Sequence, residues 1–124
     1  MKLISTDRAP APAKHYSQAV VHNGTVYVAG QLPIDPKTGV KCLGSIAEQT
    51  EQVLENLAAI LEASGSGLDR VLKVTVYISD ISLWGGVNAV YAKFFGDHRP
   101  ARAVVPTRDL HHGFLIEVEA VAAV

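Results

Sequence analysis

The sequence contains a single cysteine, Cys42, among its 124 residues. One thiol cannot form an internal disulfide, and this cysteine usage is typical of a reducing compartment. No apolar run is long enough to cross a bilayer, and residues 1–8 lack the apolar core of a secretory signal peptide. These absences predict a soluble, cytoplasmic chain that has no membrane partner.

Clusters of positive charge are also missing. The chain carries 11 lysines and arginines against 12 aspartates and glutamates, for a formal net charge of -1, and none of the positive residues form a basic run. Dedicated nucleic-acid binders obtain their affinity from clustered Lys and Arg. A nucleic-acid partner is therefore not expected.

Motifs of common metal and cofactor sites are absent as well. None of the five histidines is paired with a glutamate in the i, i+4 pattern of a zinc-binding helix, and one cysteine cannot build a thiolate site. There is no Gly-x-Ser-x-Gly elbow, no Gly-x-Gly-x-x-Gly and no P-loop. Gly65-Ser66-Gly67 is expected to end a helix, where the helix dipole disfavours phosphate. We expect neither a metal nor a cofactor.

Turn and cap signals mark the boundaries of the elements that are present. Asn23-Gly24 suits a tight hairpin turn, because both of its residues accept positive φ. Ser45 and Glu48 have the spacing of a capping box. Asp80 or Ser82 is the expected cap of a second helix, and Gly96 its expected end.

Periodicity then predicts the order β-β-α-β-α-β-β within one domain, residues 1–124. The predicted strands cover residues 16–21, 25–30, 71–78, 101–105 and 114–122, and the helices run from 45 to about 64 and from about 82 to 96. This order favours an α+β fold in which both helices pack on one face of a single sheet. Several strands have small or apolar residues on both sides, so we expect a second subunit to cover the other face.

Charges in two apolar strands are the strongest functional signal. Arg102 lies in the run Ala101–Val105, and Glu117 and Glu119 lie in the last strand with the same parity, so they share one side. A charge in a core strand is costly unless it is paired or used. Either these groups form a structural ion pair, or they converge on a ligand whose carboxylate fits the guanidinium fork.

Three further positions are weaker candidates. Tyr16 opens the first predicted strand, where a tyrosine either covers the core edge or presents its phenol to a ligand. Gly30 ends the second strand, where glycine allows either a bulge or the close approach of a ligand. Asn88 on the second helix is either a solvated residue or a ligand contact.

Taken together, these segments resemble the RidA/YjgF family over nearly the whole chain. The resemblance rests on the joint order and spacing of short motifs: Tyr16-Ser17-Gln18-Ala19, Val28-Ala29-Gly30-Gln31, Asn56, Val87-Asn88-Ala89-Val90-Tyr91, Phe94-Phe95, Pro100-Ala101-Arg102 and Ile116-Glu117-Val118-Glu119-Ala120.

The resemblance implies a chorismate-mutase-like fold and a homotrimer with a central β-barrel and clefts between subunits. It also implies cofactor-independent hydrolysis of reactive 2-imino or enamine acids to 2-keto acids and ammonia. The family's carboxylate-binding arginine falls on Arg102, its water-orienting glutamate on Glu117, its active-site tyrosine on Tyr16 and its strand-end glycine on Gly30. Asn88 and Val104 complete the expected substrate-binding set.

Four short segments depart from the family pattern. Lys14-His15 replaces the frequent Gly-Pro before the tyrosine, and Ala29 replaces a serine. Ala103-Val104 replaces Ser or Thr followed by Cys, and Leu110-His111-His112-Gly113 stands where Leu-Pro is usual. These departures bear on substrate range and rate.

Two other functions remain open from the sequence. A trimer could hold small carboxylates such as keto acids without turnover, and the apolar Ala103-Val104 pair suits that reading. A ribonuclease or translation inhibitor is the third possibility, and the near-neutral charge argues against it.

Overall fold

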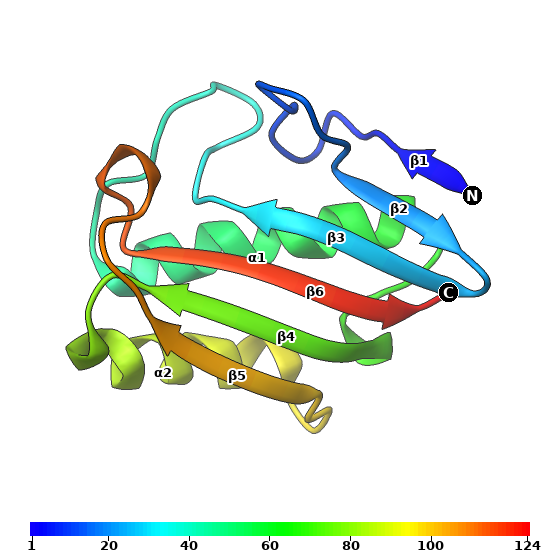
Figure 1. Cartoon of the computed structure of the whole chain (residues 1–124). Helices are drawn as coiled ribbons and strands as arrows, with labels where there is room; N and C mark the ends of the chain where they lie inside the picture. Colours follow the sequence, from blue (N-terminus) through cyan, green and yellow to red (C-terminus); the bar gives the residue numbers. More distant parts are fainter.

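The structure, a computed structural model of residues 1–124, is built on a six-stranded sheet with two α-helices behind it (Figure 1). The strands lie in the order β1-β2-β3-β6-β4-β5. All neighbouring pairs are antiparallel except β4 and β5, which are parallel and joined through α2. The elements are β1 (Lys2–Ile4), β2 (Ala19–His22), β3 (Thr25–Gln31), α1 (Ile46–Ala63), β4 (Val71–Ile78), α2 (Trp84–Phe95), β5 (Ala101–Pro106) and β6 (Ile116–Ala123).

The predicted α+β arrangement of two helices on one mixed sheet is confirmed, with three differences in the strands. β1 was not predicted, because three residues are too few to show alternation. The first hairpin strand begins at Ala19, so Tyr16 lies in the loop before it. The last strand begins at Ile116, after a short 3₁₀ turn at His111–Gly113.

Local signals account for the ends of the first hairpin and of α1. Asn23 and Gly24 have φ of 50° and 75°, as the predicted tight turn requires. The Ser45 hydroxyl accepts from the Glu48 N–H at 3.2 Å, and the Glu48 carboxylate accepts from the Ser45 N–H at 3.4 Å, which forms the predicted capping box. Gly65, with φ of 81°, ends the helix.

The start of α2 differs from the prediction. Asp80 caps a separate 3₁₀ turn, Ile81–Leu83, by accepting from the Ser82 N–H at 2.8 Å. That turn leads directly into α2, whose N-cap, Leu83, supplies no side-chain hydrogen bond. Ser82 is therefore not a cap.

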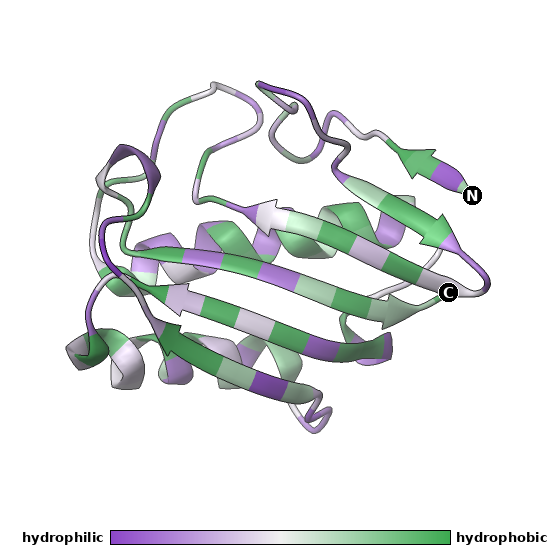
Figure 2. Cartoon of the chain, viewed as in Figure 1, coloured by the Kyte–Doolittle hydropathy of each residue, from purple (hydrophilic) through white to green (hydrophobic).

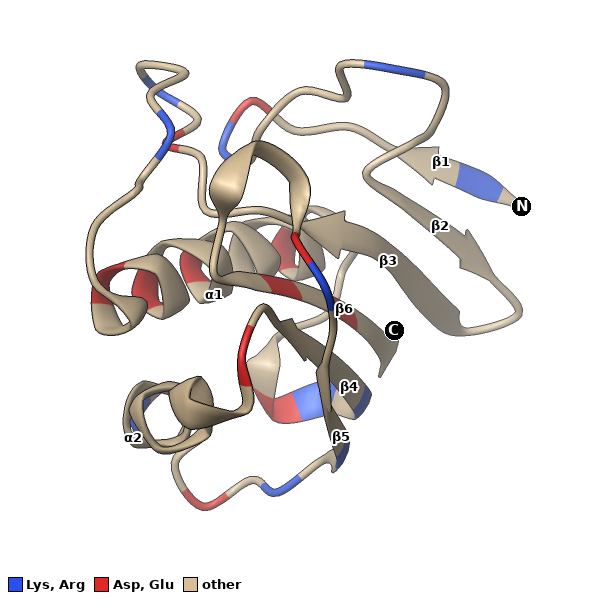
Figure 3. Ribbon diagram, turned by 60° about the vertical axis from the view of Figure 1, so that its left-hand side comes forward, with Lys and Arg blue, Asp and Glu red and all other residues tan.

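The core lies between the sheet and the helices. In β6, Ile116, Val118, Ala120 and Ala122 are buried and alternate with partly exposed residues. Figure 2 shows hydrophobic and hydrophilic residues alternating along the first half of this strand. The exposed side of α1 carries acidic residues (Figure 3), among them Glu48, Glu51, Glu55 and Glu62. Neither helix has the length and apolar character that crossing a membrane requires.

We call the sheet surface opposite the helices the open face. Directly paired residues of neighbouring strands point to the same side. Tyr77 pairs with Glu117 and with Val105, and Thr75 pairs with Glu119 and with Ala103. The open face therefore mixes carboxylates with aromatic and aliphatic groups, including Tyr27, which is 52% exposed.

Candidate active site

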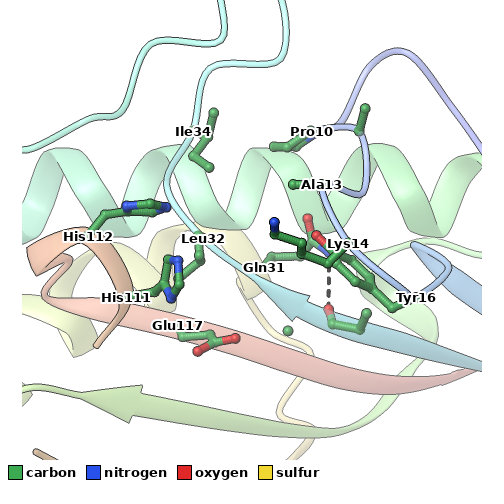
Figure 4. A pocket seen from close by; sticks show the side chains of 13 residues that line it. Pro10, Ala13, Lys14, Tyr16, Gln31, Leu32, Ile34, His111, His112 and Glu117 are labelled. Carbon is green, nitrogen blue, oxygen red and sulfur yellow. Dashed lines mark hydrogen bonds between the residues drawn. The ribbon is translucent and has the colours of Figure 1, made fainter. Parts of the chain in front are cut away.

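The largest pocket lies at one end of the sheet, around the carboxylate of Glu117 (Figure 4). We call it the Glu117 pocket. It has a volume of about 530 Å³, and it is formed by the loop before β2, the end of β3 and the turn before β6. Of the predicted site residues, Tyr16, Gly30 and Glu117 line it.

Because Gly30 has no side chain, the Glu117 carboxylate has space beside the β3 backbone. A Cβ placed on Gly30 would collide with Oε2 of Glu117 and would lie 3.1 Å from its Cδ. The carboxyl group therefore lies directly against the β3 backbone, where the pairing of β3 with β6 is irregular between Val28 and Gln31. A glycine is needed here for this close approach.

The surroundings of Glu117 favour its protonated form. Burial raises the pKa of the Glu117 carboxyl above its usual value, and the neighbouring charge of Glu119 raises it further, while His111 acts in the opposite direction. Glu119 itself accepts a hydrogen bond from the Tyr77 hydroxyl at 2.8 Å. A carboxyl with a raised pKa in a pocket is suited to proton transfer near neutral pH.

Buried amide side chains hold the pocket-forming loops. Gln18, 2% exposed, donates to the carbonyls of Thr6, Ala9 and Pro10. Asn56 of α1 donates to the Leu32 and Ile34 carbonyls at 3.1 and 2.9 Å. Each amide ties a loop to the core.

Gln49 of α1 completes this set. Its side chain accepts from the Leu115 N–H at 2.9 Å and donates to the Gly44 carbonyl at 3.0 Å, which fixes the turn before β6. The positioning role of these amides was not predicted from the sequence. The available signal was a pair of amides seven residues apart, Gln49 and Asn56, within the apolar stripe of α1.

Arg102 lies elsewhere, at the sheet edge formed by β5. It pairs with Val74, a fully buried residue, and so points to the helix side of the sheet. Its Nη1 donates to Asn88 Oδ1 at 2.9 Å, and its guanidinium carbon lies 4.7 Å from the Tyr91 ring centroid and 5.5 Å from that of Trp84. A hydrogen bond and two aromatic rings thus hold the guanidinium in one place.

A second pocket of about 500 Å³ surrounds this arginine. Its polar lining consists of Asn88, Tyr91, His98, Arg99 and Arg102. The hydroxyl of Tyr91 is buried without a hydrogen-bond partner. Trp84 and Tyr91 were not predicted from the sequence as neighbours of Arg102. Their positions on α2, at i and i+7, were the available signal.

Arg102 and Glu117 of one chain lie on opposite faces of the sheet. Arg102 pairs with Val74 and Glu117 with Tyr77, and residues an odd number apart on β4 face opposite sides. The hypothesis of an ion pair between Arg102 and Glu117 or Glu119 is therefore wrong within a single chain. The one salt bridge of the chain joins Arg8 to Glu62. One protomer therefore brings Tyr16 and Glu117 to one pocket and leaves Arg102 in the other.

The remaining predicted contact, Val104, lines neither pocket and packs against the hydrophobic core. No group of three or more His, Cys, Asp or Glu side chains is placed to hold a metal ion.

Comparison with known proteins agrees with this architecture. The family model described as Endoribonuclease L-PSP matches residues 6–124. A RutC family protein of Pyrococcus horikoshii is 49% identical over 121 residues, covering 98% of this chain and 96% of that protein. The 2-iminobutanoate/2-iminopropanoate deaminase of Rattus norvegicus is 44% identical over 121 residues, covering 98% and 88%.

Solved structures give the same result. A putative endoribonuclease of Thermotoga maritima superposes with a TM-score of 0.97 at 48% identity, covering 100% of this chain and 98% of that one. The YjgF gene product of E. coli superposes with a TM-score of 0.94 at 37% identity, covering 99% and 98%. Fold and pocket thus define a small α+β protein with a carboxylate-containing pocket at the sheet end. The chain belongs to the RidA/YjgF family.

Proposed function

We propose that this protein hydrolyses reactive 2-imino acids, and the enamines in equilibrium with them, to 2-keto acids and ammonia. The observation that carries the proposal is the Glu117 carboxyl, which lies in a pocket against Gly30 and has a raised pKa. Relatives 40–44% identical, including the human and rat proteins, are named 2-iminobutanoate/2-iminopropanoate deaminase, which supports this activity.

The proposed site is shared between subunits. Arg102 is on β5, an edge strand, and its guanidinium lies across the sheet from Glu117 of the same chain. In a homotrimer whose open faces form a central barrel, Arg102 of one subunit reaches the Glu117 pocket of the next. Such a cyclic, head-to-tail arrangement creates one site at each subunit interface.

In this site Arg102 binds the substrate carboxylate through two parallel hydrogen bonds. Asn88 positions the guanidinium, and the Tyr16 hydroxyl and the Gly30 backbone orient the imine group. Val104, two residues after Arg102 on β5, stays a predicted substrate contact.

Glu117 then positions a water molecule against the imine carbon and accepts one of its protons. The water oxygen bonds to carbon and a proton passes to nitrogen, which gives a carbinolamine. The hydroxyl proton of the carbinolamine then passes to the amine nitrogen by way of Glu117, so that the C=O bond forms as the C–N bond breaks. Keto acid and ammonia leave, Glu117 returns to its starting state, and no cofactor is consumed.

A coupled assay with a serine or threonine dehydratase tests this function. The purified protein should accelerate keto-acid release after the dehydratase step. Arg102→Ala should lower kcat/KM roughly 30- to 1,000-fold, the equivalent of roughly 2–4 kcal/mol of lost charge-assisted binding, and leave the protein folded.

The alternatives give different results in the same assay. Keto-acid binding without faster release would favour a carboxylate-binding protein. If Arg102→Ala unfolded the chain, a structural role for the arginine would replace the proposed one.

Since the proposed substrate forms in amino-acid metabolism, and Cys42 is the only cysteine, we propose that the protein is cytoplasmic.

A further inference from the structure

Basic side chains gather at the mouth of the Glu117 pocket. Lys14, His111 and His112 line it, and Glu117 is the only acidic residue among its lining residues. Lys14 comes from the loop before β2 and the histidines from the turn before β6, so two segments distant in sequence meet here (Figure 4).

None of these three basic side chains forms a salt bridge or a hydrogen bond within the chain. The chain's salt bridge lies between other residues, and neither Lys14 nor the two histidine rings form a side-chain hydrogen bond. Burial, followed by the charges of His111 and Lys41, lowers the pKa of His112. A neutral imidazole still donates one N–H, and a lysine ammonium donates three, so the pocket mouth presents free donors.

The turn that carries the histidines is held in place. The His111 and His112 rings meet edge to face, with centroids 4.0 Å apart, and His112 makes a similar contact at 6.0 Å with the buried ring of Phe114. His112 has φ of 55°, and the Leu115 N–H donates to Gln49. The donors are therefore preorganised, which lowers the entropy cost of binding.

The pocket has a volume of about 530 Å³ in one chain, and Arg102 of the neighbouring subunit occupies part of this space in the proposed trimer. Figure 4 places His111 next to Glu117, and Lys14 on the other side of the pocket.

We propose that the Glu117 pocket is selective for 2-imino acids whose side chain ends in a second carboxylate. This inference rests on the proposed function. The α-carboxylate binds Arg102 of the neighbouring subunit, and the side-chain carboxylate binds Lys14 and His111. These two residues determine specificity, and their donors offset the repulsion between Glu117 and a dianionic substrate.

The test compares imines that an amino-acid oxidase generates in place from glutamate and from leucine. The wild-type protein should hydrolyse the glutamate-derived imine with a kcat/KM about tenfold or more above that for the leucine-derived imine. Lys14→Gln and His111→Gln should each lower this ratio about tenfold. Lys37→Gln, which removes an exposed lysine outside the pocket, should leave the ratio unchanged.

Equilibrium binding of stable keto acids gives a second readout that is independent of turnover. 2-Oxoglutarate should bind more tightly than 2-oxobutanoate, and Lys14→Gln should abolish the difference. A protein that hydrolyses the leucine-derived imine but shows neither preference would overturn the inference alone. A protein that accelerates neither imine would overturn the proposed function. Lys14-dependent binding of 2-oxoglutarate would then still support dicarboxylate selectivity in the pocket.

Discussion

At the residue scale, the ionisation of Glu117 should determine the pH dependence of the reaction. Because burial and Glu119 raise its pKa, the acid limb of kcat/KM should lie above the ordinary glutamate value of 4.5. Glu119→Gln removes the neighbouring charge, so the limb should move to lower pH. A glutamine at 119 still offers an acceptor to the Tyr77 hydroxyl. If the acid limb of kcat/KM did not move in Glu119→Gln, Glu117 would not be the titrating group.

Glu117→Gln separates the chemical role of this residue from any structural role. A carboxyl whose pKa is raised on folding stabilises the folded state below its unfolded pKa, and this contribution is lost as the pH rises through the folded value. At neutral pH the neutral amide should therefore leave the free energy of unfolding equal or higher. Activity should fall sharply, and a combined loss of activity and stability would contradict this account.

Gly30→Ala should displace the Glu117 carboxylate without disrupting the sheet. The added methyl group collides with the end of a side chain that can rotate away, and Gly30 does not have positive φ. We expect at least a tenfold loss in kcat/KM, the equivalent of roughly 1.4 kcal/mol, with a nearly unchanged melting temperature. Gly24→Ala, which changes a turn glycine far from the pocket, is the contrasting variant and should lower stability, because Gly24 has φ of 75°. Full activity in Gly30→Ala would show that the close approach is not required.

The unusual positions of Arg102, Glu117 and Glu119 could be recognised from the sequence, but their arrangement in space could not. The shared parity of Glu117 and Glu119 could be read from one strand, and the structure confirms it. The relative facing of Arg102 and Glu117 depends on the register of β4 against both β5 and β6, which a single sequence does not encode locally. The partners of Arg102 on α2 depend on the same packing.

At the element scale, the two glycines at the start of α2 should behave differently. A Cβ on Gly85 meets nothing within 4 Å, whereas one on Gly86 would lie 2.7 Å from Cγ2 of Ile46 on α1. Gly85→Ala should stabilise the protein by about 0.5–1 kcal/mol, because alanine suits a helix better than glycine. Gly86→Ala should lack this gain or be destabilising. Urea unfolding at one protein concentration measures both, and equal stabilisation would contradict the close helix packing.

Elements with strong local signals were predicted well, and elements that depend on distant partners were not. The strand 71–78 agrees with β4, and the capping box and Gly65 correctly bound α1. β1 exists because Lys2–Ile4 pairs with Ala19–Val21 across the sheet, a contact that three residues cannot signal by themselves. Asp80 does act as a cap, but it caps the 3₁₀ turn that precedes α2 and not α2 itself.

At the scale of the whole molecule, the proposed trimer accounts both for the open face of the sheet and for the separation of Arg102 from Glu117. A second copy would cover Tyr27 and Val105, and it would supply the missing half of the site. We therefore expect a trimer by size-exclusion chromatography with light scattering. A monomer that retains full activity would contradict the shared site.

Mixing two inactive variants tests the shared site most directly. Arg102→Ala and Glu117→Ala are each expected to be inactive as homotrimers. After denaturation and refolding together in equal amounts, every mixed trimer should contain one interface with both an intact Arg102 and an intact Glu117. Random assembly then places about one quarter of all sites in working order, so activity should return to about one quarter of the wild-type value. No recovery, from trimers shown to be mixed, would contradict the account and place the whole reaction within one chain.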